Sequence, residues 1–314
     1  KTNGGGSTAL MLACQNGHHH VALQLIDAGA NVDTLSKYGY TALMKACNTG
    51  LGNVALRLIK DGANVNKATN NNGWTALMTA CQNGLDHVAP ELIRAGADVD
   101  HATKNGTTAL MLACEYGQRP CALQLIRAGA DVDHATKNGA TALMLACKNG
   151  HDPCARELIK EGEAKVDQTD GEGYTALMIA CDDGHDQCAR VMIEARANVN
   201  TVDNGGFTAL MMACQHGHDR VALQLINEGA KVDQTDKNGY TALIWACQEG
   251  HDQCALATIK AGAKLDAVNK DGFTALMLAW KNGHDLCILQ LVLRRLVRSK
   301  SQTALSRARH IMGA

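Results

Sequence analysis

The sequence predicts an all-α solenoid, a curved stack of helix-turn-helix units whose connections project as β-hairpin fingers. Two observations predict this fold. The tripeptide Thr-Ala-Leu recurs at intervals of 33 or 34 residues, and every interval holds two short apolar stripes at helical spacing. Helices this short are marginal alone, so each unit has to bury its apolar face against its neighbours. The repeated threonines are Thr8, Thr41, Thr75, Thr108, Thr141, Thr175, Thr208, Thr241 and Thr274.

The unit that begins at Thr108 shows the order of the elements. Apolar residues within 110–117 recur at helical spacing and end at a glycine, which predicts a first helix. A second stripe within 121–129 predicts a second helix, and it also ends at a glycine, where a left-handed residue is favoured. Residues 130–139 then predict an extended arm that finishes with an Asn-Gly turn signal.

Three motifs of this unit have counterparts in a known family. The signature T-P-L-H-x-A reads Thr-Ala-Leu-Met-Leu-Ala at 108–113, a G-H turn stands at 150–151, and G-A-x-V-D stands at 129–133. Over residues 1–293 the chain therefore resembles the ankyrin repeats, in about nine copies. The resemblance implies a non-catalytic scaffold that binds partner proteins through its concave face and hairpin fingers. Alanine replaces the family's proline, and methionine replaces its histidine in every copy except at Ile244.

The end of the chain carries a strong segregation of charge. We expect a repeat array over 1–293 and a basic segment over 294–314. A solenoid end has to cover its apolar face, which favours a capping helix that prolongs the last outer helix. The alternative is a tail from Arg294 that docks on an acidic or membrane surface, and the tripeptide at 303–305 is interpreted as the relic of a tenth repeat. After Asp285 the basic residues are Arg294, Arg295, Arg298, Lys300, Arg307 and Arg309, with no acidic residue.

Departures from the repeat unit predict local irregularities. Residues 70–73 add one residue to a finger tip, and a second insertion falls within 161–165. Arg196 stands where Gly129 stands in repeat four, so a side chain is forced into a left-handed position and a soft joint is expected there.

The composition excludes several classes of partner. The chain has 30 basic and 31 acidic residues and a net charge of −1, whereas a nucleic-acid binder needs a cationic surface. A membrane span needs about 18 uninterrupted apolar residues, and the sequence has no such stretch. We therefore expect protein partners, with no nucleic acid and no membrane span.

The cysteines predict the compartment. Thirteen cysteines, an odd number at regular intervals, fit buried thiols better than disulfides. We expect an intracellular, reducing environment, most simply the cytoplasm. The sequence starts at Lys1, so any targeting sequence lies before it and the chain is expected to be a fragment or a processed product.

The sequence predicts no catalytic, cofactor-binding or metal site. Histidine and cysteine recur three residues apart, as at His151 and Cys154 or His284 and Cys287, but the pairs begin different outer helices. Zinc needs four converging ligands, and the cysteine replaces a valine of other repeats, so a structural role is favoured. A redox or metal sensor that uses the cysteines remains an alternative. No nucleophile elbow, phosphate loop or dinucleotide fingerprint is present.

The aromatic residues predict the binding surface. Of the ten aromatics, six come directly before a repeated threonine, where a finger meets the first helix. Tyr116 and Trp245 stand at variable positions of first helices. Large aromatics dominate binding hot spots, although local packing is the alternative role. The predicted partner-binding residues are Tyr40, Trp74, Tyr116, Tyr174, Phe207, Tyr240, Trp245 and Phe273.

Two functions follow from this reading. The first is a non-catalytic protein-interaction scaffold, long enough to serve as a subunit of a larger assembly. The second keeps the fold but makes the array the recognition arm of a larger multidomain enzyme or channel whose other domains lie outside residues 1–314. Surface residues decide the partner of a solenoid, so the sequence leaves the partner unidentified.

Overall fold

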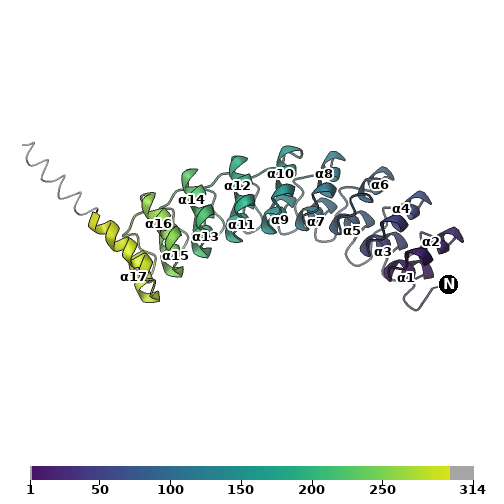
Figure 1. Ribbon diagram of the computed structural model, residues 1–314, viewed down its shortest axis with the longest axis horizontal. Coiled ribbons are helices and arrows are strands. Elements are labelled where there is room, and N and C mark those ends of the chain that lie inside the picture. Colours follow the sequence, from purple (N-terminus) through teal and green to yellow (C-terminus); the bar gives the residue numbers. More distant parts are fainter. Residues whose placement is uncertain (1, 298–314) are drawn as a thin grey trace, which may run out of the picture. The chain divides into compact units, whose positions relative to one another are not determined.

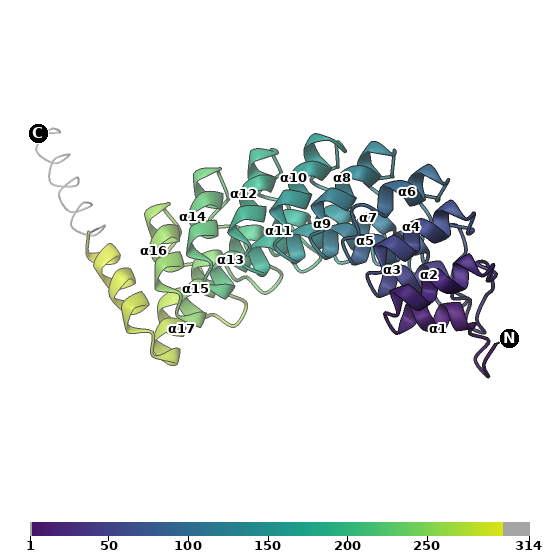
Figure 2. The same ribbon diagram turned by 45° about the vertical axis from the view of Figure 1, so that its right-hand side comes forward.

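The computed structural model describes residues 2–297, which divide into two compact units. Unit 1 extends to Gly171 and unit 2 begins at Glu172. Figures 1 and 2 show that each unit consists of pairs of short helices joined by loops. The predicted all-α repeat fold is confirmed. Most of the predicted basic segment, with the tripeptide at 303–305, lies outside the described residues.

In unit 1 the first helices of successive repeats pack side by side, and the second helices form a parallel row (Figure 1). Each first helix also contacts the second helix of its own repeat. The first helices are α1 (Ala9–Gln15), α3 (Ala42–Asn48), α5 (Ala76–Gln82), α7 (Ala109–Glu115) and α9 (Ala142–Lys148). The second helices are α2 (His19–Asp27), α4 (Gly52–Lys60), α6 (Ala89–Arg94), α8 (Arg119–Arg127) and α10 (Asp152–Lys160).

Unit 2 repeats the same two rows. Its first helices are α11 (Ala176–Asp182), α13 (Ala209–His216), α15 (Ala242–Glu249) and α17 (Ala275–Asn282). Its second helices are α12 (Asp186–Glu194), α14 (Asp219–Asn227) and α16 (Asp252–Lys260). The second helix after α17 occupies residues 285–297, so it runs beyond the repeat length as the sequence predicts.

Each first helix begins at its repeated threonine for the same local reason. The threonine is the N-cap in extended backbone geometry, and its Oγ1 accepts a hydrogen bond from the N–H three residues later. In repeat two this bond joins Met44 N and Thr41 Oγ1 at 3.1 Å. It satisfies one of the N–H groups that a helix start leaves unbonded. The threonine therefore recurs because it sets where the helix starts.

The core of each repeat comes from the residues that follow this threonine. In repeat four, Leu110 and Met111 are each 1 % exposed and Cys114 is fully buried. All thirteen cysteines are buried, and they remain thiols. The prediction of buried thiols is confirmed, because each cysteine acts as a small apolar side chain.

The fingers are tight turns with little strand character. In the finger before α7, Thr103 N–H donates to Thr107 O at 2.9 Å, and Gly106 N–H donates to Thr103 O at 2.8 Å. Neighbouring fingers are joined by one backbone bond, as where Lys104 N–H donates to Asn72 O at 2.9 Å. Such short pairing suffices to align each finger with the next. Isolated β-bridges in the described chain join Thr2 with Thr8 and Val268 with Thr274.

The irregular positions differ from the regular repeats in their backbone. Arg196 keeps the left-handed geometry, with φ at 66°, and Glu163 near the second insertion has φ at 55°. A side chain in this region costs about 1 kcal/mol relative to glycine. In the finger with the first insertion, Trp74 N–H bonds to Thr69 Oγ1 five residues back, whereas the corresponding step is four residues between Thr103 and Thr107.

Candidate protein-binding surface

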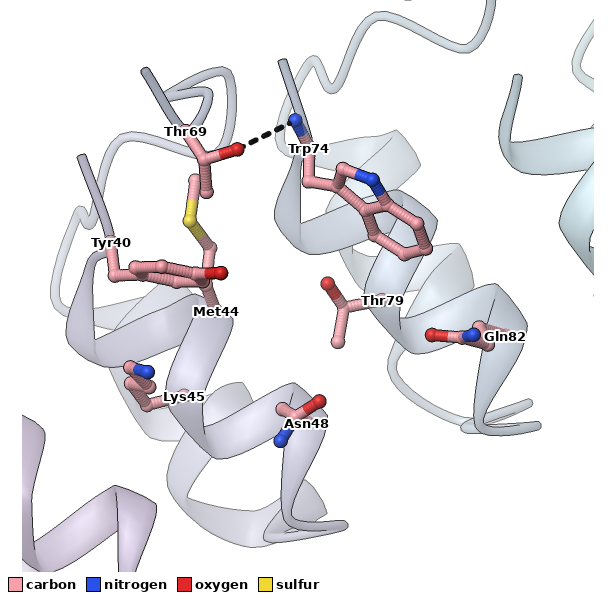
Figure 3. A pocket seen from close by; sticks show the side chains of 8 residues that line it. All are labelled: Tyr40, Met44, Lys45, Asn48, Thr69, Trp74, Thr79 and Gln82. Carbon is pink, nitrogen blue, oxygen red and sulfur yellow. Dashed lines mark hydrogen bonds between the residues drawn. The ribbon is translucent and has the colours of Figure 1, made fainter. Parts of the chain in front are cut away.

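A pocket lies in unit 1 between two neighbouring fingers and the first helices below them. We call it the Tyr40–Trp74 pocket, after the two predicted binding residues that form its walls. Figure 3 shows the Tyr40 ring and the Trp74 indole on either side, with the Thr79 side chain of α5 pointing into the space between them. Its volume is about 140 Å³, similar to the cavity of about 150 Å³ that accommodates benzene. The pocket therefore fits one side chain. Its lining residues are Tyr40, Met44, Lys45, Asn48, Thr69, Trp74, Thr79 and Gln82.

The pocket joins apolar walls to a polar lower end. Lys45 Nζ lies 4.0 Å from the centre of the Tyr40 ring, a cation–π contact. Partial burial lowers the pKa of Lys45 below its ordinary value of 10.5. The Asn48 and Gln82 amides complete this end (Figure 3). A partner side chain with an apolar stem and a hydrogen-bonding tip matches this arrangement.

Finger side chains hold the aromatic walls in place. Ser36 Oγ accepts a bond of 3.0 Å from Tyr40 N–H, and Thr69 Oγ1 accepts one of 3.0 Å from Trp74 N–H (Figure 3). The backbone of each aromatic residue is thereby fixed before any ligand arrives. A second shallow pocket borders Trp74 on the side of the next finger and is lined by Asn72, Trp74, Thr103, Lys104, Asn105 and Thr107.

Unit 2 has an aromatic cluster at the same kind of position. The Trp245 ring stacks on Tyr240 with centroids 4.5 Å apart, and it contacts Phe207 at 5.5 Å. Such pairs contribute about 0.5–1.5 kcal/mol each beyond burial. The Trp245 indole N–H is buried and has no hydrogen-bond partner among the described residues. Phe207, Tyr240 and Trp245 are all half-buried, so the cluster presents only part of its area to a partner.

One repeat position determines whether the space between two finger aromatics is open, as in the pocket, or filled, as in the cluster. Trp245 comes four residues after its repeated threonine, and Thr79 comes four residues after Thr75. Each lies between the aromatic residue of its own finger and that of the preceding finger. The indole fills this space in unit 2, whereas the small Thr79 leaves it open in unit 1.

The remaining predicted residues lie apart from these two groups. Tyr116 is the C-cap of α7 and is 48 % exposed. Tyr174 is half-buried directly before the Thr175 cap. Phe273 is also half-buried, with Lys281 Nζ 5.5 Å from its ring centre. Five of the eight predicted residues thus belong to the pocket or to the cluster.

Sequence reasoning missed several lining residues. Met44 belongs to the ordinary framework of a first helix, and Asn48 and Gln82 stand at the end of that helix at a position that is polar in every repeat. Thr79 carries a usable signal, because its repeat position varies from one repeat to the next. Tyr38, 53 % exposed at a finger tip, was also missed, because it does not precede a repeated threonine.

The histidines of the G-H turns have structural contacts. His284 Nε2 lies 2.9 Å from Gln248 O, and His218 Nε2 lies 3.1 Å from Asp182 O. Each carbonyl belongs to the end of the preceding repeat's first helix, so the histidine joins two repeats. Within residues 2–297, no group of three or more histidine, cysteine or acidic side chains is placed to hold a metal ion.

Burial keeps several of the core thiols protonated. It raises the pKa of Cys14 to about 11 and that of Cys47 to about 12, from the ordinary value of 9.0. The pKa of Cys181 in unit 2 is raised by the same desolvation. A thiol of this kind is a poor nucleophile near neutral pH, because the thiolate is the reactive form.

Comparison with protein families agrees with the fold. Family models described as ankyrin repeats match residues 1–69, 58–136, 121–203, 162–236, 196–266 and 243–293. The chain belongs to the ankyrin-repeat family, whose repeats are generally protein–protein interaction modules and typically non-catalytic. A comparison with curated proteins finds no match. No helix in the described part of the chain is long and apolar enough to cross a membrane.

Proposed function

We propose that the chain is a non-catalytic scaffold that binds a partner protein by taking one of its side chains into the Tyr40–Trp74 pocket. The main support for this proposal is the pocket itself. Its two walls are aromatic residues whose backbones are fixed by hydrogen bonds, and they lie on the surface predicted from the sequence. A buried aromatic anchor point surrounded by polar groups is the usual arrangement of an interface hot spot. The surrounding finger tips and first helices supply the rest of the contact area.

The other aromatic residues serve this function in a secondary role. The Phe207 and Tyr240 rings both contact Trp245, so we propose that the three support the unit 2 fingers and present a flat edge to the partner. Tyr116 in unit 1 and Phe273 in unit 2 would each add a further contact from their own unit. We place the protein in a reducing compartment inside the cell, most simply the cytoplasm, because thirteen buried thiols suit such an environment.

The test is an affinity capture from native extract, read out by mass spectrometry. Tyr40→Ala and Trp74→Ala are combined in one variant to remove both walls. The matched control is Leu223→Ala on α14, where the leucine is 51 % exposed on a second helix. We expect partners captured by the wild type and the control to be lost by the double variant.

Folding of each variant is checked by circular dichroism before capture. Partners that remain bound to a folded double variant would contradict the assignment of the pocket. Loss of the same partners by Leu223→Ala would show that binding uses the second helices, and it would also contradict the proposal.

A further inference from the structure

The helix at residues 285–297 exposes an apolar stripe. Leu286 is 60 % exposed, Leu289 53 % and Leu293 52 %. These positions are three and four residues apart, so the side chains lie along one side of the helix. An exposed stripe of large aliphatic side chains indicates contact with another apolar surface.

Two of these leucines break the repeat pattern. The position of Leu286 holds a polar residue or proline in the eight earlier repeats, and that of Leu293 holds a polar residue in all eight. Every one of these equivalents is exposed. The equivalents of Leu286 are His20, Asn53, His87, Pro120, Pro153, Gln187, Arg220 and Gln253. The equivalents of Leu293 are Asp27, Lys60, Arg94, Arg127, Lys160, Glu194, Asn227 and Lys260.

A further repeat would not cover Leu286 or Leu293. The equivalent positions stay exposed even where another repeat follows, so stacking leaves them in contact with solvent. Trp280, 75 % exposed on α17, differs in this respect, because its equivalent Cys247 is fully buried by the next repeat. The occupant of the Leu286 and Leu293 side therefore has to approach from outside the stack.

Charge indicates the chemistry of that occupant. Arg294 and Arg295 lie on the same helix, and the sequence after Asp285 contains six basic residues and no acidic one. Arg295 forms an ion pair with Asp266, which ties this helix to the finger before α17. A second copy would bring the same cations together, which disfavours self-association through this face. Exposed leucines on a helix that also carries arginines, and whose sequence continues with four further cations, match the pattern that binds an anionic lipid surface.

We propose that the helix at 285–297 docks on an anionic membrane surface, with Leu286, Leu289 and Leu293 inserted among the lipids and the adjoining basic residues among the headgroups. The helix would lie in the plane of the interface and hold the array against the membrane. This surface is separate from the Tyr40–Trp74 pocket, so the proposal does not depend on the protein partner.

The test is co-sedimentation of the full chain with vesicles of phosphatidylcholine alone and of phosphatidylcholine mixed with phosphatidylserine. Leu286→Gln and Leu293→Asn are combined, because earlier repeats carry these residues at the same exposed positions and folding is therefore retained. Leu223→Gln is the matched control, with a leucine that is 51 % exposed on α14. We expect binding to the mixed vesicles only, weakened by salt and reduced at least about tenfold in the double variant.

Three results would overturn the proposal. The first is equal binding by the double variant and the wild type. The second is equal binding to neutral and anionic vesicles, since the charge argument would then be wrong. The third is no vesicle binding, together with self-association or capture of an acidic protein that the double variant loses, since another protein would then cover the stripe.

Discussion

The Tyr40–Trp74 pocket of unit 1 and the aromatic cluster of unit 2 differ at the repeat position that lies between two finger aromatics. Thr79 in unit 1 and Trp245 in unit 2 each lie between two finger aromatics. The threonine leaves a space for a ligand side chain, and the indole fills that space from within. A repeat protein can thus fill or open a pocket at one repeat position without altering its framework.

The fingers of the two units are also built differently. Thr136 Oγ1 in unit 1 accepts one backbone N–H, from Ala140 at 3.1 Å. Asp236 Oδ1 in unit 2 accepts two, from Asn238 and Tyr240, both at 2.8 Å. A carboxylate that accepts two hydrogen bonds holds a turn more firmly than a hydroxyl that accepts one. The unit 2 fingers are therefore expected to be the more rigid.

The largest expected effect concerns the buried cysteines, which both units contain. Burial raises the folded-state pKa of Cys14 to about 11 and that of Cys47 to about 12. The contribution of each buried thiol to the free energy of unfolding is therefore fully present below pH 9. As the pH rises from 9 toward the folded-state pKa, this contribution falls by about 1.4 kcal/mol per thiol for each pH unit. Circular dichroism at rising pH should show loss of helix that begins above pH 9, and burial of Cys181 extends this expectation to unit 2. A chain with constant stability from about pH 9 to about pH 11 would contradict this account of the core.

Removing the two central side chains should affect the units unequally. Trp245→Ala loses two ring contacts and should destabilise unit 2 by about 3 kcal/mol. Thr79→Ala loses a hydroxyl whose Oγ1 donates to Thr75 O at 3.0 Å, and it should cost about 1 kcal/mol. Urea denaturation of both variants measures the difference. Equal losses would mean that the indole does not fill its site as described.

The finger side chains give a smaller contrast. Asp236→Ala leaves two N–H groups without their acceptor and should cost about 2 kcal/mol, against about 1 kcal/mol for Thr136→Ala. Hydrogen exchange at the amides of Asn238, Tyr240 and Ala140 reports the local effect directly. For each variant, the exchange rate is compared with that of the wild type. A larger increase at Ala140 in Thr136→Ala than at Tyr240 in Asp236→Ala would contradict the expected order.

The smallest effect concerns backbone geometry. Arg196→Gly in unit 2 and Glu163→Gly in unit 1 both remove a side chain from the left-handed region. Each should stabilise its unit by about 1 kcal/mol, detected as a higher urea midpoint. A midpoint that stays unchanged for Arg196→Gly would show that the site relaxes around the arginine and that no soft joint exists there.

The sequence predicted the fold because the apolar spacing and the turn residues within each repeat specify its two helices and its finger. The paired short helices, the buried cysteines and the left-handed Arg196 follow from local rules, and so does the choice of Tyr40 and Trp74 as surface aromatics. The pocket could not be predicted in the same way. It depends on how a residue such as Thr79 fits against the aromatic residue of the preceding finger, and that register between repeats is a property of packing.

The most direct test of the pocket fills it. Thr79→Trp places in unit 1 the indole that Trp245 supplies in unit 2, and Thr79→Val leaves the space open as a matched control. Titration of the partner captured by the wild type should show at least about thirtyfold weaker binding for the tryptophan variant. The valine variant should bind within about threefold of the wild type. Unchanged binding by a folded Thr79→Trp variant would contradict the claim that this pocket receives the partner.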